Sequence, residues 1–162
     1  VPLVIMGVAF LTTLISLFVV TWDRRPAPPQ PTSAVSAPLT GLAFSDGSGQ
    51  PVRLGTLFPA VILLVDGCDC GALVRDTART VPDTVIVVPI ARAVPVVTGA
   101  PANVRALADP NGILRTRFAT AAAEAPDAAT ALLVDRRGIV LSSVATARTV
   151  ADLGPELASL TR

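Results

Sequence analysis

Two continuous apolar runs most constrain how this chain can fold. Residues Ala60–Val65 have the sequence AVILLV, and residues Thr84–Ile90 have the sequence TVIVVPI. Neither run alternates with polar residues, so both are expected to be buried strands, the first of them central and covered on both faces. Between them, Cys70–Val81 carries apolar residues in helical spacing, and Asp69 is placed to cap the start of that helix. This order predicts a βαβ unit in an α/β fold.

Two hairpins complete the expected mixed sheet. Near the start of the domain, Leu42–Phe44 and Pro51–Leu54 flank a turn rich in Gly and Ser. Near its end, Ala129–Asp135 and Ile139–Val144 flank Arg136-Arg137-Gly138, where glycine occupies the position that needs a positive φ. A mixed parallel and antiparallel sheet with helices around it follows from this order.

The remaining segments are expected to be shorter or irregular. In chain order we predict a loop over Ala91–Ala102, a short strand or turn over Asn103–Ala108, a turn over Asp109–Gly112, a helix over Ile113–Ala123 and a final helix over Thr149–Leu160. The Gly154-Pro155 pair is expected to kink the last helix or to start it afresh.

The N-terminal segment predicts a membrane anchor. Residues Val1–Trp22 contain no charge, and 22 residues at about 1.5 Å each span roughly the 30 Å hydrocarbon core of a bilayer. Asp23-Arg24-Arg25 then marks the return to water. Residues 23–38 are rich in Pro and Ala and predict an extended linker, and residues 39–162 predict one globular domain. Arg24 and Arg25 favour a cytoplasmic domain by the positive-inside rule.

Composition excludes several classes of function. The net charge is +1, with no cluster of basic residues, so nucleic acid is not an expected partner. The chain has no His, which rules out Ser-His-Asp and Cys-His nucleophile systems as well as His-ligated metal sites. No cofactor is expected. The chemistry therefore converges on Cys68 and Cys70, the two cysteines of the sequence, at the turn between the first buried strand and the helix.

Three stretches resemble the thioredoxin-like superfamily, and within it the membrane-tethered TlpA and AhpC-type thiol-disulfide proteins. They are FSDGSGQPVRLGTLF, AVILLVDGCDCGALV, and ADPNGILRTRF together with ATALLVDRRGIV. The resemblance covers Leu39 to Leu160 and implies a thioredoxin-like fold. It also implies a domain outside the cytoplasmic membrane, behind a signal anchor. For the side of the membrane on which the domain lies, we give this resemblance more weight than Arg24 and Arg25.

The same alignment shows where the chain departs from the family. The family's active site has the pattern Trp-Cys-x-x-Cys; here Gly67 replaces the Trp, Cys68 falls on the attacking cysteine, and Gly71 takes the place of the second cysteine. Ala129 stands where the family has a cis-proline. The Pro and Thr that precede the cysteine in the peroxidase branch are absent, so peroxide reduction is not expected.

The first hypothesis is a thiol-disulfide oxidoreductase in which Cys68 attacks or is attacked, Cys70 resolves the mixed disulfide, and Asp66 relays a proton. A helix N-terminus lowers a thiol pKa, whereas a nearby carboxylate of Asp66 or Asp69 raises it. Two alternatives stay open: a non-catalytic accessory or assembly subunit of a larger integral-membrane complex, and a soft-metal protein that holds Cu(I) with two thiolates. The partners expected under the first two hypotheses are a protein dithiol or disulfide, or an integral-membrane complex.

Overall fold

The structure is a computed structural model that describes residues 38–118 and 127–160. The predicted transmembrane helix over residues 1–22 and nearly all of the predicted linker lie outside the described residues. Within the described ranges, no helix is both long and apolar enough to cross a membrane.

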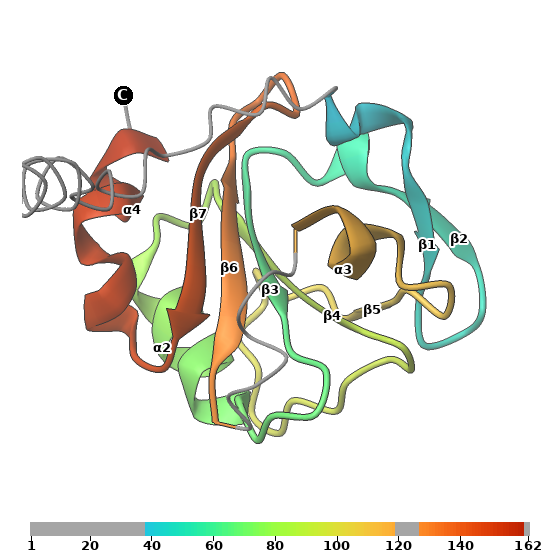
Figure 1. Ribbon diagram of the computed structural model, residues 1–162, viewed down its shortest axis with the longest axis horizontal. Coiled ribbons are helices and arrows are strands. Elements are labelled where there is room, and N and C mark those ends of the chain that lie inside the picture. The colour runs from blue at the N-terminus through green and yellow to red at the C-terminus, as the bar shows by residue number, and fades with distance from the viewer. Residues whose placement is uncertain (1–37, 119–126, 161–162) are drawn as a thin grey trace, which may run out of the picture. The chain divides into compact units, whose positions relative to one another are not determined.

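Seven strands in the described part of the chain form one mixed sheet with the order β2-β1-β5-β4-β3-β6-β7 (Figure 1). The strands are β1 Ala43–Ser45, β2 Pro51–Arg53, β3 Ala60–Leu64, β4 Ile86–Ala91, β5 Leu107–Ala108, β6 Ala129–Val134 and β7 Val140–Ala147. Both β3 and β6 are buried along their whole length. They are neighbours inside the sheet, each with a strand on both sides, as continuous apolar strands should be.

The βαβ unit is confirmed. Strand β3 runs parallel to β4, with Ala60 opposite Ile86, and helix α2 (Gly71–Thr80) connects them. On its other side β3 pairs antiparallel with β6. The helix begins after Cys70, which is its N-cap residue, and Asp69 is exposed and makes no cap hydrogen bond there. The prediction that Asp69 caps this helix is therefore wrong, because the helix starts one residue too late for its side chain to serve.

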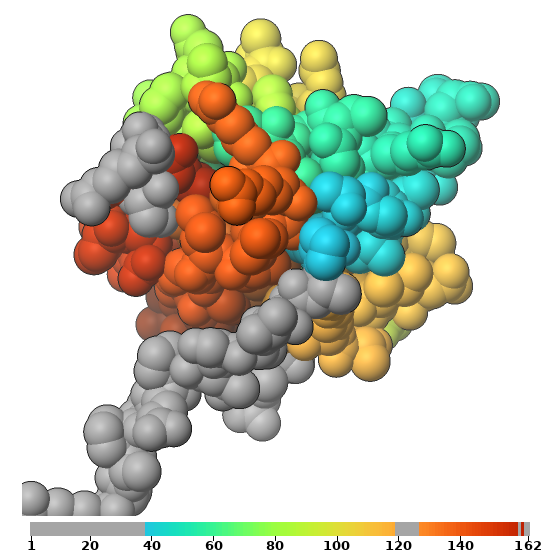
Figure 2. Space-filling model, turned by 90° about the horizontal axis from the view of Figure 1, so that it is seen from above, coloured from blue at the N-terminus to red at the C-terminus, as the bar shows by residue number. Residues whose placement is uncertain are grey.

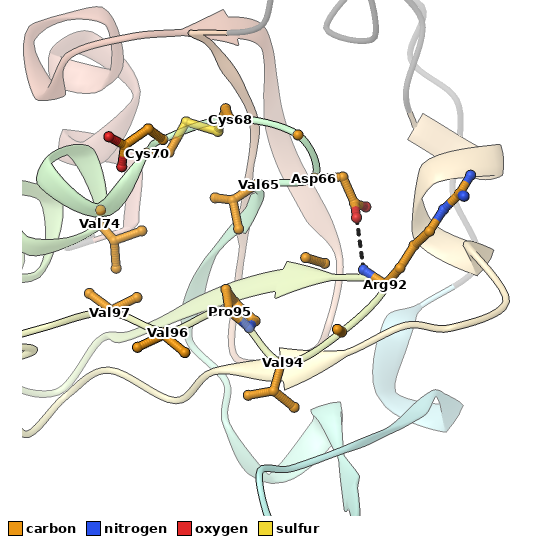
Figure 3. A pocket seen from close by; sticks show the side chains of 15 residues that line it. Val65, Asp66, Cys68, Cys70, Val74, Arg92, Val94, Pro95, Val96 and Val97 are labelled. Atoms are coloured by element: carbon orange, nitrogen blue, oxygen red, sulfur yellow. Dashed lines mark hydrogen bonds between the residues drawn. A yellow bond between two sulfur atoms is a disulfide. The ribbon is translucent and has the colours of Figure 1, made fainter.

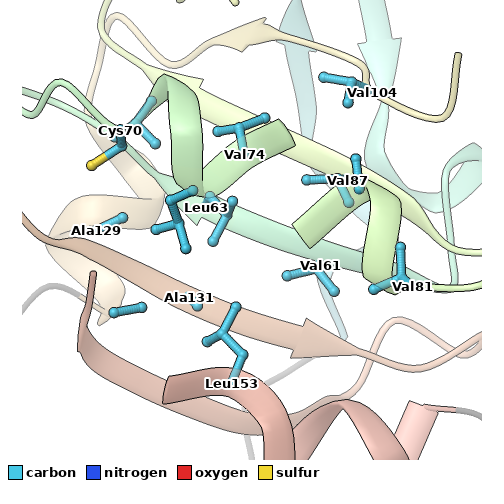
Figure 4. Packing of buried hydrophobic residues seen from close by; sticks show 14 of the residues in the cluster. Val61, Leu63, Cys70, Val74, Val81, Val87, Val104, Ala129, Ala131 and Leu153 are labelled. Atoms are coloured by element: carbon cyan, nitrogen blue, oxygen red, sulfur yellow. The ribbon is translucent and has the colours of Figure 1, made fainter. Parts of the chain in front are cut away.

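Two apolar clusters fill the two faces of the sheet. One lies under α2 and α4 (Gly154–Leu160), and the other lies under α3 (Ile113–Phe118) and the two short 3₁₀ turns η1 (Leu39–Gly41) and η2 (Leu54–Thr56) (Figure 1). Cys70 belongs to the first cluster together with Leu63 and Ala129 (Figure 4). The site is thus built directly on the core of that face.

Both predicted hairpins are confirmed as β1–β2 and β6–β7, at opposite edges of the sheet. The segment that packs beside the β6–β7 turn is η1, at the start of the described chain (Figure 2). Gly138, in the β6–β7 turn, has φ +80° and its carbonyl accepts a hydrogen bond of 2.9 Å from the Leu39 N–H. The last predicted helix is split into a 3₁₀ turn, η4 (Val150–Leu153), and α4, which starts afresh at Gly154. Of the predicted helix over 113–123, the described part is α3, and the rest lies outside the described residues.

Candidate thiol-disulfide site

The cysteine turn follows directly from the end of β3. The Cys68 N–H donates a 3.4 Å hydrogen bond to the Val65 carbonyl, which closes a tight turn over Asp66 and Gly67. Gly67 has φ +74°, a conformation that residues with a Cβ rarely adopt. The local backbone therefore favours glycine where the resembled family has Trp, because any residue with a Cβ would be strained at this φ.

Cys68 and Cys70 form a disulfide, with their Cα atoms 5.3 Å apart. This separation lies inside the usual range of about 4.4–6.8 Å, so the Cys-x-Cys spacing is compatible with a bridge. Cys68 is half-buried, whereas only 6% of Cys70 is exposed. The two sulfurs are therefore not equivalent: an incoming thiol reaches Cys68 first, and Cys70 is shielded by the core.

Cys70 lies at the start of helix α2. As the N-cap of a ten-residue helix, Cys70 lies where free N–H groups and the helix dipole stabilise negative charge. Burial in the apolar cluster acts in the opposite direction, because it disfavours a thiolate. When an external thiolate attacks Cys68, the electron pair of the broken S–S bond goes to Cys70.

Asp66 lies beside the disulfide, but its carboxylate turns away from the sulfurs (Figure 3). Its Oδ1 accepts a 2.8 Å hydrogen bond from the Arg92 N–H, and its Oδ2 is ion-paired with the Arg115 guanidinium on α3. The two side chains of the ion pair are 19% and 31% exposed, respectively. Asp66 thus ties the cysteine turn to the end of β4 and to the helix on the other face of the sheet.

A pocket of about 500 Å³ opens beside the disulfide (Figure 3). One side is formed by the cysteine turn and the first turns of α2, and the other by the segment that follows β4. The side chains on this second side are mostly apolar: Val94, Pro95, Val96 and Val97. A disulfide with one partly exposed cysteine, beside a partly apolar pocket, can receive a thiol together with part of the molecule that carries it.

The structure brings together the three predicted site residues, since Asp66, Cys68 and Cys70 all line this pocket. Ala129 does not line it; it is fully buried in the cluster that contains Cys70. Sequence reasoning missed Arg92 and Arg115, the two partners of Asp66. It also missed the apolar side of the pocket formed by Val94–Val97, called the apolar wall below. The Pro-Val-Val run inside the predicted loop was the one available signal for that wall, because apolar residues are unusual in an exposed connection.

No protein-family model matches this sequence, and no curated protein matches it either. Solved structures do match. A secreted Mycobacterium tuberculosis disulfide oxidoreductase homologous to E. coli DsbE has 20% identity and a TM-score of 0.54, over 75% of this chain and 97% of that one.

Two peroxide-related proteins are similar to the same degree. The Xanthomonas campestris bacterioferritin comigratory protein, described for alkyl peroxide reduction, has 15% identity and a TM-score of 0.57, over 80% of this chain and 97% of its own. The peroxidoxin BcpB of Mycobacterium tuberculosis has 18% identity and a TM-score of 0.53, over 78% and 96%. These likenesses show a thioredoxin-like fold, and the neighbours belong to both the disulfide oxidoreductase and the peroxiredoxin types.

Proposed function

We propose that this protein is a membrane-tethered, extracytoplasmic thiol-disulfide oxidoreductase that acts through Cys68 and Cys70. The observation that carries the proposal is the unequal exposure of the disulfide: both cysteines line the pocket, but Cys68 is only half-buried, whereas Cys70 is buried at the start of α2. Disulfide exchange requires attack on one sulfur and departure of the other, and this arrangement supports Cys68 as the attacked sulfur and Cys70 as the one that leaves.

The exchange proceeds in two steps. A substrate thiolate attacks the Cys68 sulfur, forms a mixed disulfide and releases Cys70 as a thiolate. A second thiolate of the substrate then attacks the substrate sulfur of the mixed disulfide and releases Cys68 as a thiolate, so the substrate leaves oxidised and both cysteines are left reduced. The cycle closes when an external disulfide reoxidises the pair. In total, one dithiol is oxidised and one disulfide is reduced.

The test is catalysis of that net reaction. A peptide with two thiols is mixed with oxidised glutathione, and formation of the peptide disulfide is followed with and without a catalytic amount of the full chain. Acceleration that is lost when Cys68 is replaced by Ser supports the proposal. If the Cys68→Ser variant accelerates the reaction as much as the natural chain does, the proposal is wrong.

Membrane tethering is the second part of the proposal, and it rests on the uncharged segment Val1–Trp22. In cells, a thiol reagent that does not cross membranes should label the reduced Cys68 from outside, while a cytoplasmic control protein stays unlabelled. Labelling only after the membrane is permeabilised would place the domain on the other side.

A non-catalytic accessory subunit is the alternative. It is favoured by the replacement of the family's proline by Ala129, which is buried in the core and forms no part of the pocket. In this case, purification in mild detergent would yield a complex with a stoichiometric membrane partner and no exchange activity. A clean monomer that catalyses exchange contradicts the alternative.

A further inference from the structure

The segment after β4 exposes apolar surface next to the disulfide. Val96 is 91% exposed, about twice the 46% of Leu141, another exposed aliphatic residue of the described chain. Single exposed aliphatic residues are ordinary on a protein surface. Val96, however, belongs to four consecutive apolar residues, Val94–Val97, that line the same pocket as Cys68.

This segment is held at both ends by residues that flank the disulfide. At its start, the Arg92 N–H donates to Asp66 Oδ1 at 2.8 Å, and Asp66 lies two residues before Cys68. At its end, Arg75 Nη1 donates to the Thr98 carbonyl at 3.1 Å. Arg75 is on α2, the helix that begins directly after Cys70. The apolar wall is therefore positioned by the same turn and helix that carry the two sulfurs.

Arg75 reaches the segment from the first turns of α2. A Cβ placed on Gly71 would lie 3.5 Å from Arg75 Nη1, so the guanidinium passes over the start of the helix that Cys70 caps. Since a loop without regular structure has few internal hydrogen bonds, the loss of one anchor should let its end move away. Arg75 and Asp66 are thus positioning residues for the wall.

The charged residues of the pocket do not favour a positively or a negatively charged substrate. Asp66 is already paired with Arg115, and the exposed Asp69 and Arg92 at the mouth carry opposite charges. What remains for recognition is apolar contact with Val94–Val97. In an extended peptide, residues i and i+2 point to the same side, so a cysteine aimed at Cys68 would turn the residues two positions away toward the protein.

We infer that the site acts on cysteines in extended polypeptide segments whose residues two positions away are apolar, and that Val94–Val97, held by Arg75 and Asp66, is the surface that binds them. This inference rests on the proposed function and names its substrate class. It also accounts for Ala129, because the wall beside the disulfide comes from the β4–β5 connection and not from the position of the family's proline.

The experiment measures the rate at which peptide thiols open the disulfide of the oxidised full chain. Two peptides are compared, Leu-Gly-Cys-Gly-Leu and Ser-Gly-Cys-Gly-Ser, with dithiothreitol as a small dithiol. We expect the natural chain to react at least about fivefold faster with the Leu peptide, through tighter binding at low peptide concentration, because partial burial of aliphatic side chains is worth roughly this factor.

Val96→Ser should bring the ratio of the two rates close to one, whereas Leu141→Ser, the matched control on β7, should leave it unchanged. Arg75→Met should lower the ratio by raising the peptide concentration needed for half-maximal rate. Arg75→Lys keeps a hydrogen-bond donor, so it should retain part of the preference for the Leu peptide. Arg79→Met, on the same helix, should leave the ratio of the two rates unchanged.

The outcomes separate the two proposals. If dithiothreitol does not open the disulfide at a measurable rate, the proposed function fails and the inference fails with it. If dithiothreitol opens it but the two peptides react equally, or if Val96→Ser keeps the preference for Leu, only the inferred substrate class is overturned.

Discussion

Two aspartates follow the two fully buried strands β3 and β6, and they serve different purposes. Asp135 follows β6, and its Oδ1 accepts hydrogen bonds from the N–H groups of Arg137 and Ile139, at 2.8 and 2.9 Å. Asp66 follows β3 by two residues, and its partners are Arg92, 26 residues away, and Arg115 on α3. The first aspartate stabilises a local turn, and the second joins distant segments around the disulfide.

The glycines of the two turns differ in the same way. Gly138 is buried against η1, and a Cβ there would lie 2.7 Å from Thr40 Cγ2 and 2.9 Å from Phe58 Cε2. A Cβ placed on Gly67, by contrast, would have no heavy atom of another residue within 4 Å apart from its chain neighbours. The β6–β7 turn is therefore locked by packing, whereas the turn that carries Cys68 is held by polar contacts and has room on its outer side.

The largest effect on stability is expected from Gly138→Ala. Its positive φ and two close contacts should together lower the free energy of unfolding by about 3 kcal/mol. Gly67→Ala meets only the φ penalty and should cost about 1 kcal/mol. Urea unfolding of the two variants measures the difference. Equal losses would show that the two turns are packed alike.

Asp66→Asn should have an intermediate effect. Asn keeps an acceptor for the Arg92 N–H but removes the ion pair with Arg115, a partly exposed contact worth about 1 kcal/mol after solvent screening. Asp135→Asn is the matched control; it keeps the side-chain acceptor of a local turn and should cost less than about 0.5 kcal/mol. Chemical denaturation compares them, and an equal cost would contradict the long-range role of Asp66.

The same variant tests the hypothesis that Asp66 relays a proton. A relay acts on every thiol, so Asp66→Asn would then slow the reaction with dithiothreitol as much as the reaction with peptides. A positioning role predicts instead that the preference for the Leu peptide falls more than the rate with dithiothreitol. Comparing the loss of rate with dithiothreitol to the loss of preference for the Leu peptide therefore distinguishes a relay from a positioning role.

The smallest effect concerns a third, local aspartate. Asp152 accepts hydrogen bonds from the N–H groups of Arg148 and Thr149, each at 2.9 Å, and these bonds hold the pKa of its carboxyl below the ordinary value. A lowered folded-state pKa contributes stability that is fully present above about pH 4 and is lost as pH falls through the folded-state pKa.

Asp152→Asn should therefore lower Tm slightly at pH 7, and the difference from the natural chain should narrow as the pH drops below about 4. Thermal unfolding across this pH range checks it. A difference in Tm that is the same at pH 7 and at strongly acid pH would mean that the charge of Asp152 is not what matters.

The comparison of the two aspartates also explains how far the sequence predicts this protein. Local patterns were sufficient for both hairpins and for β3 and β4, because continuous apolar runs, turn residues and Gly at a positive φ act within a few residues. The N-cap was misplaced by one residue, since Asp69 is a far commoner cap than Cys70. The anchors of the pocket wall carry no such local pattern: Arg75 reaches Thr98 across 23 residues, and only the fold brings them together.

The most direct test of the central claim is to compare the two single-cysteine variants, Cys70→Ser and Cys68→Ser, in their rate of mixed-disulfide formation with an aromatic disulfide reagent. Because Cys68 is open to the pocket and Cys70 is buried in the core, the chain with Cys68 alone should react at least about 100-fold faster. If the chain with Cys70 alone reacts as fast or faster, the assignment of Cys68 as the attacked sulfur is wrong.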